Sequence, residues 1–119
     1  MIDELIHRTF CSRNATHLAH WRTKSFAQHQ ALGSFYDEII DLVDKLVEAH
    51  MGAAGKVIGS FEIPALPPVK DILKHLSEEV NWIDEHRSEI ADGVAALENI
   101  VDEIAGLYLS TIYKLKQLS

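Results

Sequence analysis

The strongest constraint on the fold of this chain is a long run of residues, 26–51, whose apolar side chains recur every three or four positions. This spacing gathers them on one face of an α-helix, and such a face needs a partner surface to cover it. The face consists of Leu32, Phe35, Tyr36, Ile39, Val43, Leu46 and Val47. The opposite flank carries Asp37, Asp41, Asp44 and Glu48. The run therefore predicts a long amphipathic helix inside an all-α domain.

Three further segments show helical spacing, so the chain is expected to form a four-helix bundle. We expect helices over residues 2–21, 26–51, 68–87 and from 91 or 92 to 118. Ser25 is expected to cap the second helix, with Gln28 completing a capping box, and Gly52 is expected to end it. The glycine- and proline-rich stretch 52–68 is the one long connector, which indicates two helical hairpins joined by a crossover. Residues 1–119 are expected to form this single domain.

Composition argues against several classes of protein. No apolar run approaches the ~20 residues that a membrane-spanning helix needs, and the acidic N-terminus is unlike a signal peptide. The single cysteine, Cys11, excludes an internal disulfide framework and favours a cytoplasmic setting. The net charge of -7 argues against a protein whose main function is to bind the phosphate backbone of nucleic acids. The seven histidines are the one compositional indication of chemistry.

Two of these histidines bracket the short break between the first two predicted helices. His20 lies at the end of the first helix and His29 in the first turn of the second, so both imidazoles are expected at the same end of the hairpin. Neutral imidazole is a common ligand of transition metals. Asp44 and Glu48 are one helical turn apart on the second helix, so their carboxylates share a face and are able to bind one cation.

The histidines and the acids cannot meet within one chain. Asp44 follows His29 by about 15 positions, which is roughly 22 Å along a rigid helix at ~1.5 Å per residue. Side chains do not bridge that distance. A two-fold axis between antiparallel second helices would instead place His20 and His29 of one copy beside Asp44 and Glu48 of another. Symmetry would then produce two equivalent sites in a homo-oligomer.

Residues 14–52 resemble the Dps family, the small cage-forming members of the ferritin-like superfamily. The resemblance lies in His20-Trp21, His29 and the segment DKLVE at 44–48. It implies a ferritin-like four-helix bundle, a two-fold interface of the second helices and a dodecameric cage. It also implies a ferroxidase that oxidises ferrous iron with peroxide or dioxygen and sequesters it, with zinc or manganese able to substitute. No catalytic residue is expected apart from the metal ligands, which would be His20, His29, Asp44 and Glu48. The residues expected to support these ligands are His17, Trp21, Asp37 and Asp41.

The chain also departs from that family. The segment between the two histidines is shorter, and the basic N-terminal tail that gives many members their DNA binding is missing, so we do not expect DNA binding. A phage-encoded relative working in the host cytoplasm would look like this. An alternative function stays open at this point: a bundle without metal chemistry that acts as an interaction or virion-associated structural protein. On that alternative the histidines are ordinary helix-end residues and the acids a solvated flank.

Overall fold

The computed structural model describes residues 1–63, 65 and 68–118. Its helices are α1 (Ile2–Arg22), α2 (Phe26–Ala54), α3 (Ile72–Glu85), the short α4 (Arg87–Ile90) and α5 (Ala95–Gln117). The described residues contain no strand, so the predicted all-α class is confirmed. No helix in this part of the chain combines the length and the apolar character required to cross a lipid bilayer.

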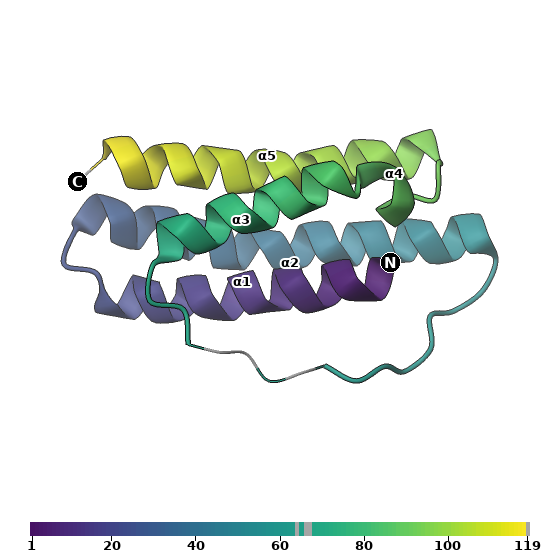
Figure 1. Cartoon of the computed structure of the whole chain (residues 1–119), viewed down its shortest axis with the longest axis horizontal. Helices are drawn as coiled ribbons and strands as arrows, with labels where there is room; N and C mark the ends of the chain where they lie inside the picture. The colour runs from purple at the N-terminus through teal and green to yellow at the C-terminus, as the bar shows by residue number, and fades with distance from the viewer. Residues whose placement is uncertain (64, 66–67, 119) are drawn as a thin grey trace.

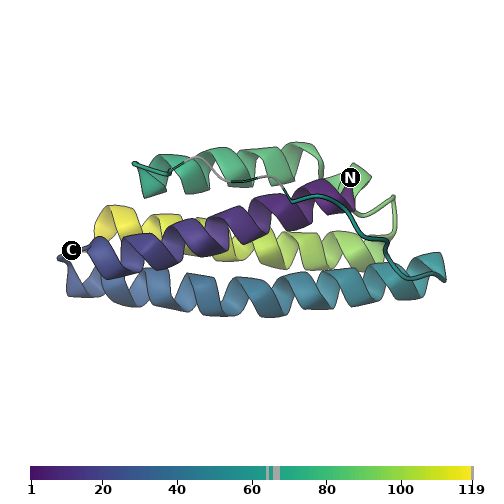
Figure 2. The same cartoon turned by 90° about the horizontal axis from the view of Figure 1, so that it is seen from below.

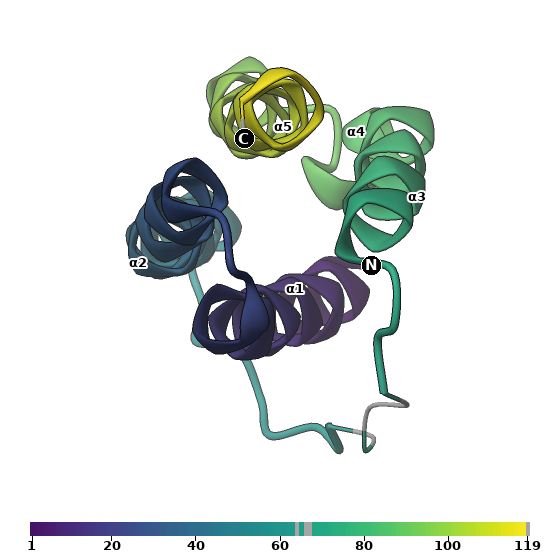
Figure 3. The ribbon, with the colours of Figure 1, turned by 90° about the vertical axis from the view of Figure 1, so that its left-hand side faces the viewer.

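The four long helices lie side by side, with α1 and α5 each in contact with both α2 and α3. Figure 1 shows α2 and α3 running in one direction and α1 and α5 in the other. The end-on view in Figure 3 shows the four helices arranged around a common centre. The described parts of the connector between α2 and α3 lie on the outer side of α1 (Figures 1 and 3), and α3 begins at the opposite end of the molecule from the end of α2 (Figures 1 and 2). Two of the prolines that indicated this connector, Pro64 and Pro67, lie outside the described residues.

The core is built from the apolar faces of all four long helices. Phe35, Ile39 and Leu46 of α2 have no exposed surface, as the helical pattern predicts. Tyr108 of α5 is equally buried, and its ring lies edge-on to that of Phe35 with 4.9 Å between the centroids. Edge-on aromatic pairs of this kind stabilise beyond the area they bury. The α2–α5 contact therefore forms a central part of the core.

The start of α2 follows the prediction and its end does not. The Ser25 hydroxyl accepts a hydrogen bond from the backbone N–H of Gln28 at 3.2 Å, so the predicted N-cap is confirmed. The capping box is wrong, because the Gln28 side chain accepts from the Thr23 hydroxyl instead. The helix runs through Gly52, since an interior glycine weakens a helix without ending it. It stops at Gly55, whose φ of 72° lies in the left-handed region that glycine adopts readily.

The boundaries of the last two predicted helices also need correction. The third begins at Ile72 and not near residue 68, because the Asp71 carboxylate caps it by accepting from the backbone N–H of Lys74 at 3.1 Å. The fourth predicted helix corresponds to α5, which begins at Ala95 and not at residue 91 or 92, and the separate short helix α4 lies before it. Between them, Asp92 and Gly93 have φ values of 53° and 70°, which no α-helix accommodates. The chain turns at these two residues.

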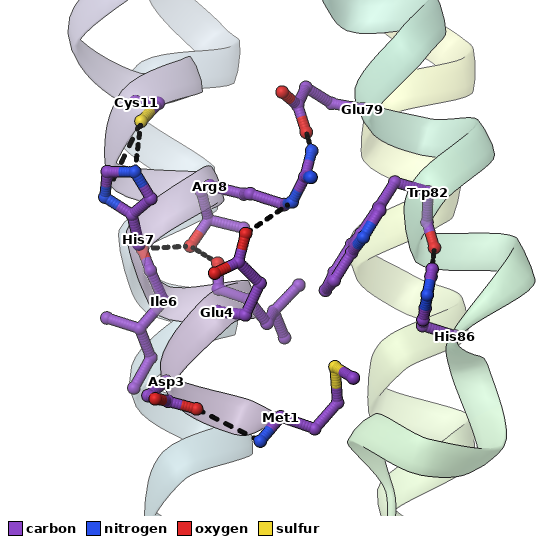
Figure 4. A network of polar contacts seen from close by, with 12 residues as sticks. Met1, Asp3, Glu4, Ile6, His7, Arg8, Cys11, Glu79, Trp82 and His86 are labelled. Carbon is purple, nitrogen blue, oxygen red and sulfur yellow. Dashed lines mark hydrogen bonds and ion pairs between the residues drawn. The ribbon is translucent and has the colours of Figure 1, made fainter. Parts of the chain in front are cut away.

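Polar contacts join α1 to α3 around the guanidinium of Arg8 (Figure 4). It donates to Glu79 at 2.7 Å and to Glu4 at 3.0 Å, and it lies over the ring of Trp82, 4.3 Å from the centroid. Trp82 in turn stacks on His86, with 4.5 Å between the ring centroids. A partly buried arginine that satisfies a carboxylate and an aromatic face holds two helices in a fixed register. Neither partner of Arg8 on α3 was foreseen from the sequence.

A second polar contact between α1 and α3 makes stability depend on pH. Ser12 is fully buried, and its hydroxyl lies 3.0 Å from Nε2 of His75. Burial lowers the pKa of His75, and the nearby Arg8 acts in the same direction, whereas Glu79 and Glu78 act against it. The folded state therefore favours neutral His75. Its contribution to stability is complete above the ordinary histidine pKa and is lost as the pH falls below that value.

We expect the free energy of unfolding to decrease between about pH 7.5 and about pH 5.5, a range in which most carboxylates stay ionised. The variant His75→Gln has no titrating group at this position, so its stability should decrease less over the same range. Urea denaturation of both proteins at each pH measures the difference. An equal decrease in the two proteins would show that His75 is not the group responsible.

Candidate metal centre

The turn between α1 and α2 brings His20 and His29 together. α1 ends at Arg22 and is followed by Thr23 in an extended conformation, and α2 begins at Phe26, directly after the Ser25 cap. This short reversal stacks the two imidazoles, with 3.6 Å between the ring centroids and 19° between the ring planes. Both side chains are partly buried. The proximity expected from the sequence is therefore present within a single chain.

Each of these imidazoles is held by the backbone of the other residue. Nδ1 of His20 lies 2.6 Å from the carbonyl oxygen of His29, and Nδ1 of His29 lies 2.8 Å from the carbonyl oxygen of His20. A carbonyl oxygen only accepts, so each Nδ1 must carry the hydrogen. The lone pair of each neutral ring is then on Nε2. Hydrogen bonds of this type orient metal-binding histidines and fix their tautomer.

Gly33 makes room for this arrangement on α2. A Cβ atom at position 33 would lie 3.2 Å from Cε1 and 3.3 Å from Nδ1 of His20, closer than nearly all real contacts of a Cβ atom. The absence of a side chain therefore lets His20 approach the helix that carries His29. Gly33 itself is a sequence signal for this contact, because an isolated glycine inside a strong helical pattern often marks a close packing contact.

An aromatic group borders the histidine pair. His17 stacks on Tyr36 with 4.0 Å between ring centroids, and the ring of Tyr36 is edge-on to His20 at 5.3 Å. Burial lowers the pKa of His17, and Arg13 and His20 add to this effect. His17 is thus a neighbour of the pair, as expected, but the role of Tyr36 was missed because it was taken as a core residue.

Trp21 is the most exposed member of this group. Its ring lies 4.2 Å from that of His17, but 65% of its surface is open to solvent. The structure therefore places Trp21 against His17, whose ring centroid lies 6.3 Å from that of His20.

The acidic residues lie elsewhere on α2. Asp37, Asp41, Asp44 and Glu48 are all exposed and follow one face of the helix away from the histidine pair. None of the four takes part in an ion pair with another described residue. α2 is one uninterrupted helix (Figure 1), so Asp44 lies roughly 22 Å from His29 along its axis at ~1.5 Å per residue. Within a single chain, the predicted histidine ligands and the predicted carboxylate ligands are therefore too far apart to bind the same ion.

Across the described residues, no three histidine, cysteine, aspartate or glutamate side chains come close enough to hold one metal ion. The structure therefore gathers two of the four predicted ligands, His20 and His29, and leaves Asp44 and Glu48 apart from them. One chain carries two incomplete halves: a nitrogen pair at one end of α2 and a carboxylate pair toward the other.

Comparison with known proteins places this chain in a family. The profile of a protein family described as of unknown function, DUF5856, matches residues 20–115. The chain belongs to DUF5856. The matched region begins at His20 and includes His29, Gly33, Asp44 and Glu48, so both incomplete halves of the candidate site lie inside the DUF5856 domain.

This DUF5856 chain is also similar to a protein of Enterobacteria phage T4. That relative is described as an uncharacterized 14.6 kDa protein in the mobD–ri intergenic region. The two chains are 26% identical over 114 residues, which cover 95% of this chain and 86% of the phage protein. No solved structure matches the chain significantly.

Proposed function

We propose that this DUF5856 protein binds ferrous iron at a site shared between two copies of the chain, oxidises it and sequesters it. We further propose that its fold is ferritin-like. The parallel course of α2 and α3, joined by one long crossover, supports that assignment, because ferritin-like bundles contain one such connection. The iron function rests on the resemblance to the Dps family and on the geometry of the histidine pair.

The single observation that carries the proposal is the reciprocal bonding of His20 and His29. Two stacked imidazoles whose Nδ1 hydrogens are both bound to carbonyl oxygens present two Nε2 lone pairs from neighbouring positions. This tautomer leaves the Nε2 lone pair of both rings free for a metal ion, which binds the unprotonated nitrogen.

The second half of the site comes from another copy. A two-fold axis between antiparallel α2 helices places the partner subunit's Asp44 and the partner subunit's Glu48 beside His20 and His29. Both acids are exposed and have no ion pair among the described residues, so they are available as ligands. In each copy, α2 holds the histidine pair and the carboxylate pair at a fixed distance. An antiparallel pair of α2 helices can therefore bring both sets of ligands together at the same time.

Such a site suits ferrous iron chemically. Two imidazole nitrogens and two carboxylates are a mixed donor set of the kind that binds Fe²⁺, and zinc or manganese competes for it. Four protein ligands leave a coordination position for dioxygen or peroxide. Two Fe²⁺ ions would each give one electron to the oxidant and become Fe³⁺, for which carboxylate oxygens are good ligands. With two protons, these two electrons reduce peroxide to two water molecules or dioxygen to hydrogen peroxide. The acidic surface of α2 attracts the incoming cations.

Titration with Fe²⁺ in air tests the proposal. We expect the ferric absorbance to rise faster than in protein-free buffer, and we expect His29→Ala and Glu48→Ala each to remove the increase. His7→Ala serves as the matched control, since His7 lies on α1 far from the turn and is expected to leave the rate unchanged.

Mixing two inactive variants tests whether the site is shared. A variant lacking both histidines (His20→Ala with His29→Ala) and one lacking both acids (Asp44→Ala with Glu48→Ala) are each expected to be inactive. After mixing under conditions that exchange subunits, each heterodimer regains one of its two sites. No recovery would reject the shared site. A wild-type protein that binds neither Fe²⁺ nor Zn²⁺ would reject the metal function and favour an interaction or virion-associated protein.

A further inference from the structure

We propose that the exposed face of α2 is a self-association surface that pairs with a second copy only when divalent cations occupy the shared sites. Assembly of this protein would then be controlled by the metal itself. The inference rests on the proposed function, because the cations act at the site made of His20, His29 and the partner's two acids.

The register of the pairing follows from the ligands. His29 must face the midpoint between the partner subunit's Asp44 and the partner subunit's Glu48, so the two-fold axis crosses α2 near residues 37 and 38. Asp37 of one copy and the partner subunit's Asp37 then both lie next to the axis. Positions 34 and 41 face each other on either side, which brings Asp41 into the same interface.

Within α2, the charged residues of the pairing face are all acidic. Arg13 of α1 lies beside this face, with its guanidinium carbon 5.3 Å from the centroid of the Tyr36 ring. Each copy contributes four exposed carboxylates, those of Asp37, Asp41, Asp44 and Glu48. Lys45, on the neighbouring flank of α2, points to α5, where its Nζ lies 3.1 Å from Glu103. Salt at physiological strength screens charges only beyond about 8 Å, which is longer than side-chain contact distances. Two copies without metal therefore repel one another at this surface.

Divalent cations reverse this balance. Each shared site places two positive charges among the carboxylates of the interface, and the imidazole nitrogens hold them there. Phe26 supplies an attractive contact as well: it begins the same face of α2, and 75% of its surface is exposed. A ligand that binds the dimer and not the monomer stabilises the dimer by an amount that grows with the logarithm of its concentration. The exposed acids alone do not indicate a cation site. The indication comes from the oriented pair of His20 and His29.

Light scattering after gel filtration tests the inference on the full chain. We expect the mass of one chain, 13.4 kDa, in EDTA and twice that mass with Zn²⁺, which carries the same charge as Fe²⁺ but does not change oxidation state. A variant with Asp37→Asn and Asp41→Asn has less charge at the axis, so its dimer should form in EDTA with a dissociation constant at least ~10-fold lower than that of the wild type. The control variant, Asp84→Asn with Glu85→Gln, removes two exposed acids from α3 and should stay monomeric in EDTA.

Three outcomes would overturn the inference. A wild-type dimer or larger assembly that persists unchanged in EDTA would show that the interface does not need metal, while leaving the shared site intact. Zn²⁺ binding by a chain that stays monomeric would overturn both the assembly and the shared site. Failure of the Asp37 and Asp41 variant to dimerise more tightly than the Asp84 and Glu85 control would show that repulsion at this face is not the barrier.

Discussion

Replacing Gly33 with leucine is expected to separate His20 from His29 and to weaken metal binding by about 10- to 100-fold. A Cβ atom alone would already lie 3.2 Å from the His20 ring, and the larger leucine side chain cannot be accommodated there. The His20 imidazole is then expected to shift away from the position in which its Nδ1 donates to the carbonyl of His29. Both reciprocal hydrogen bonds depend on that approach, so both should be lost together.

The matched control is Gly106→Leu, because Gly106 also lies inside a helix but has no atom within 4 Å of the place of a new Cβ. Both substitutions raise helix propensity by about 1 kcal/mol, so they differ mainly in the contact with His20. Zn²⁺ titration measures the affinity, and nitrogen-15 NMR of the imidazoles reports the protonated Nδ1 atoms without any metal. Retention of both Nδ1 signals in Gly33→Leu would contradict the role given to this glycine.

The variant Phe35→Ala is expected to lower the free energy of unfolding by about 3–5 kcal/mol. Phe35 is fully buried, and its ring contacts the equally buried ring of Tyr108 across the α2–α5 interface. Truncation removes the buried area and leaves a cavity between two rigid helices that cannot collapse easily. A loss of this size is a large part of the stability of a domain of this length.

Urea denaturation in EDTA measures this effect. Phe26→Ala is the control, since it removes the same side chain from a position that is 75% exposed and should change stability by less than about 0.5 kcal/mol. Phe35→Leu should recover part of the loss because it refills most of the volume. A cost below about 1 kcal/mol for Phe35→Ala would mean that the core can repack around this site.

Hydrophobic spacing predicted the helices well wherever a long apolar face exists. The inward positions of α2 could be named from the sequence because a helix with one buried face has apolar residues at every third or fourth position. Helix ends were harder to predict. Gly52 and Gly55 have the same chemistry, and only the backbone angle of Gly55 distinguishes the one that stops the helix. The turn at Asp92 was missed for the same reason, since aspartate adopts a positive φ only when the surrounding chain requires it.

The candidate site was predictable in part. The short break in the chain places His20 and His29 at one end of a hairpin, and the rise of an α-helix keeps Asp44 away from them. The exchange of hydrogen bonds between each imidazole and the opposite carbonyl could not be predicted, because it depends on rotamers and on backbone geometry within a turn. The contact between Tyr36 and His17 was also hidden, since an aromatic residue at helical spacing is read first as part of the core.

The unequal length of the connections has a consequence for the order in which the chain assembles. Only residues 23–25 separate α1 from α2, whereas the whole of 55–71 must be spanned before α3 reaches α1. Closing a short loop costs less chain entropy than closing a long one, so the N-terminal hairpin should form early and α3 should dock later. His20 and His29 both belong to that early hairpin. The nitrogen donors are thus set in place before α3 docks.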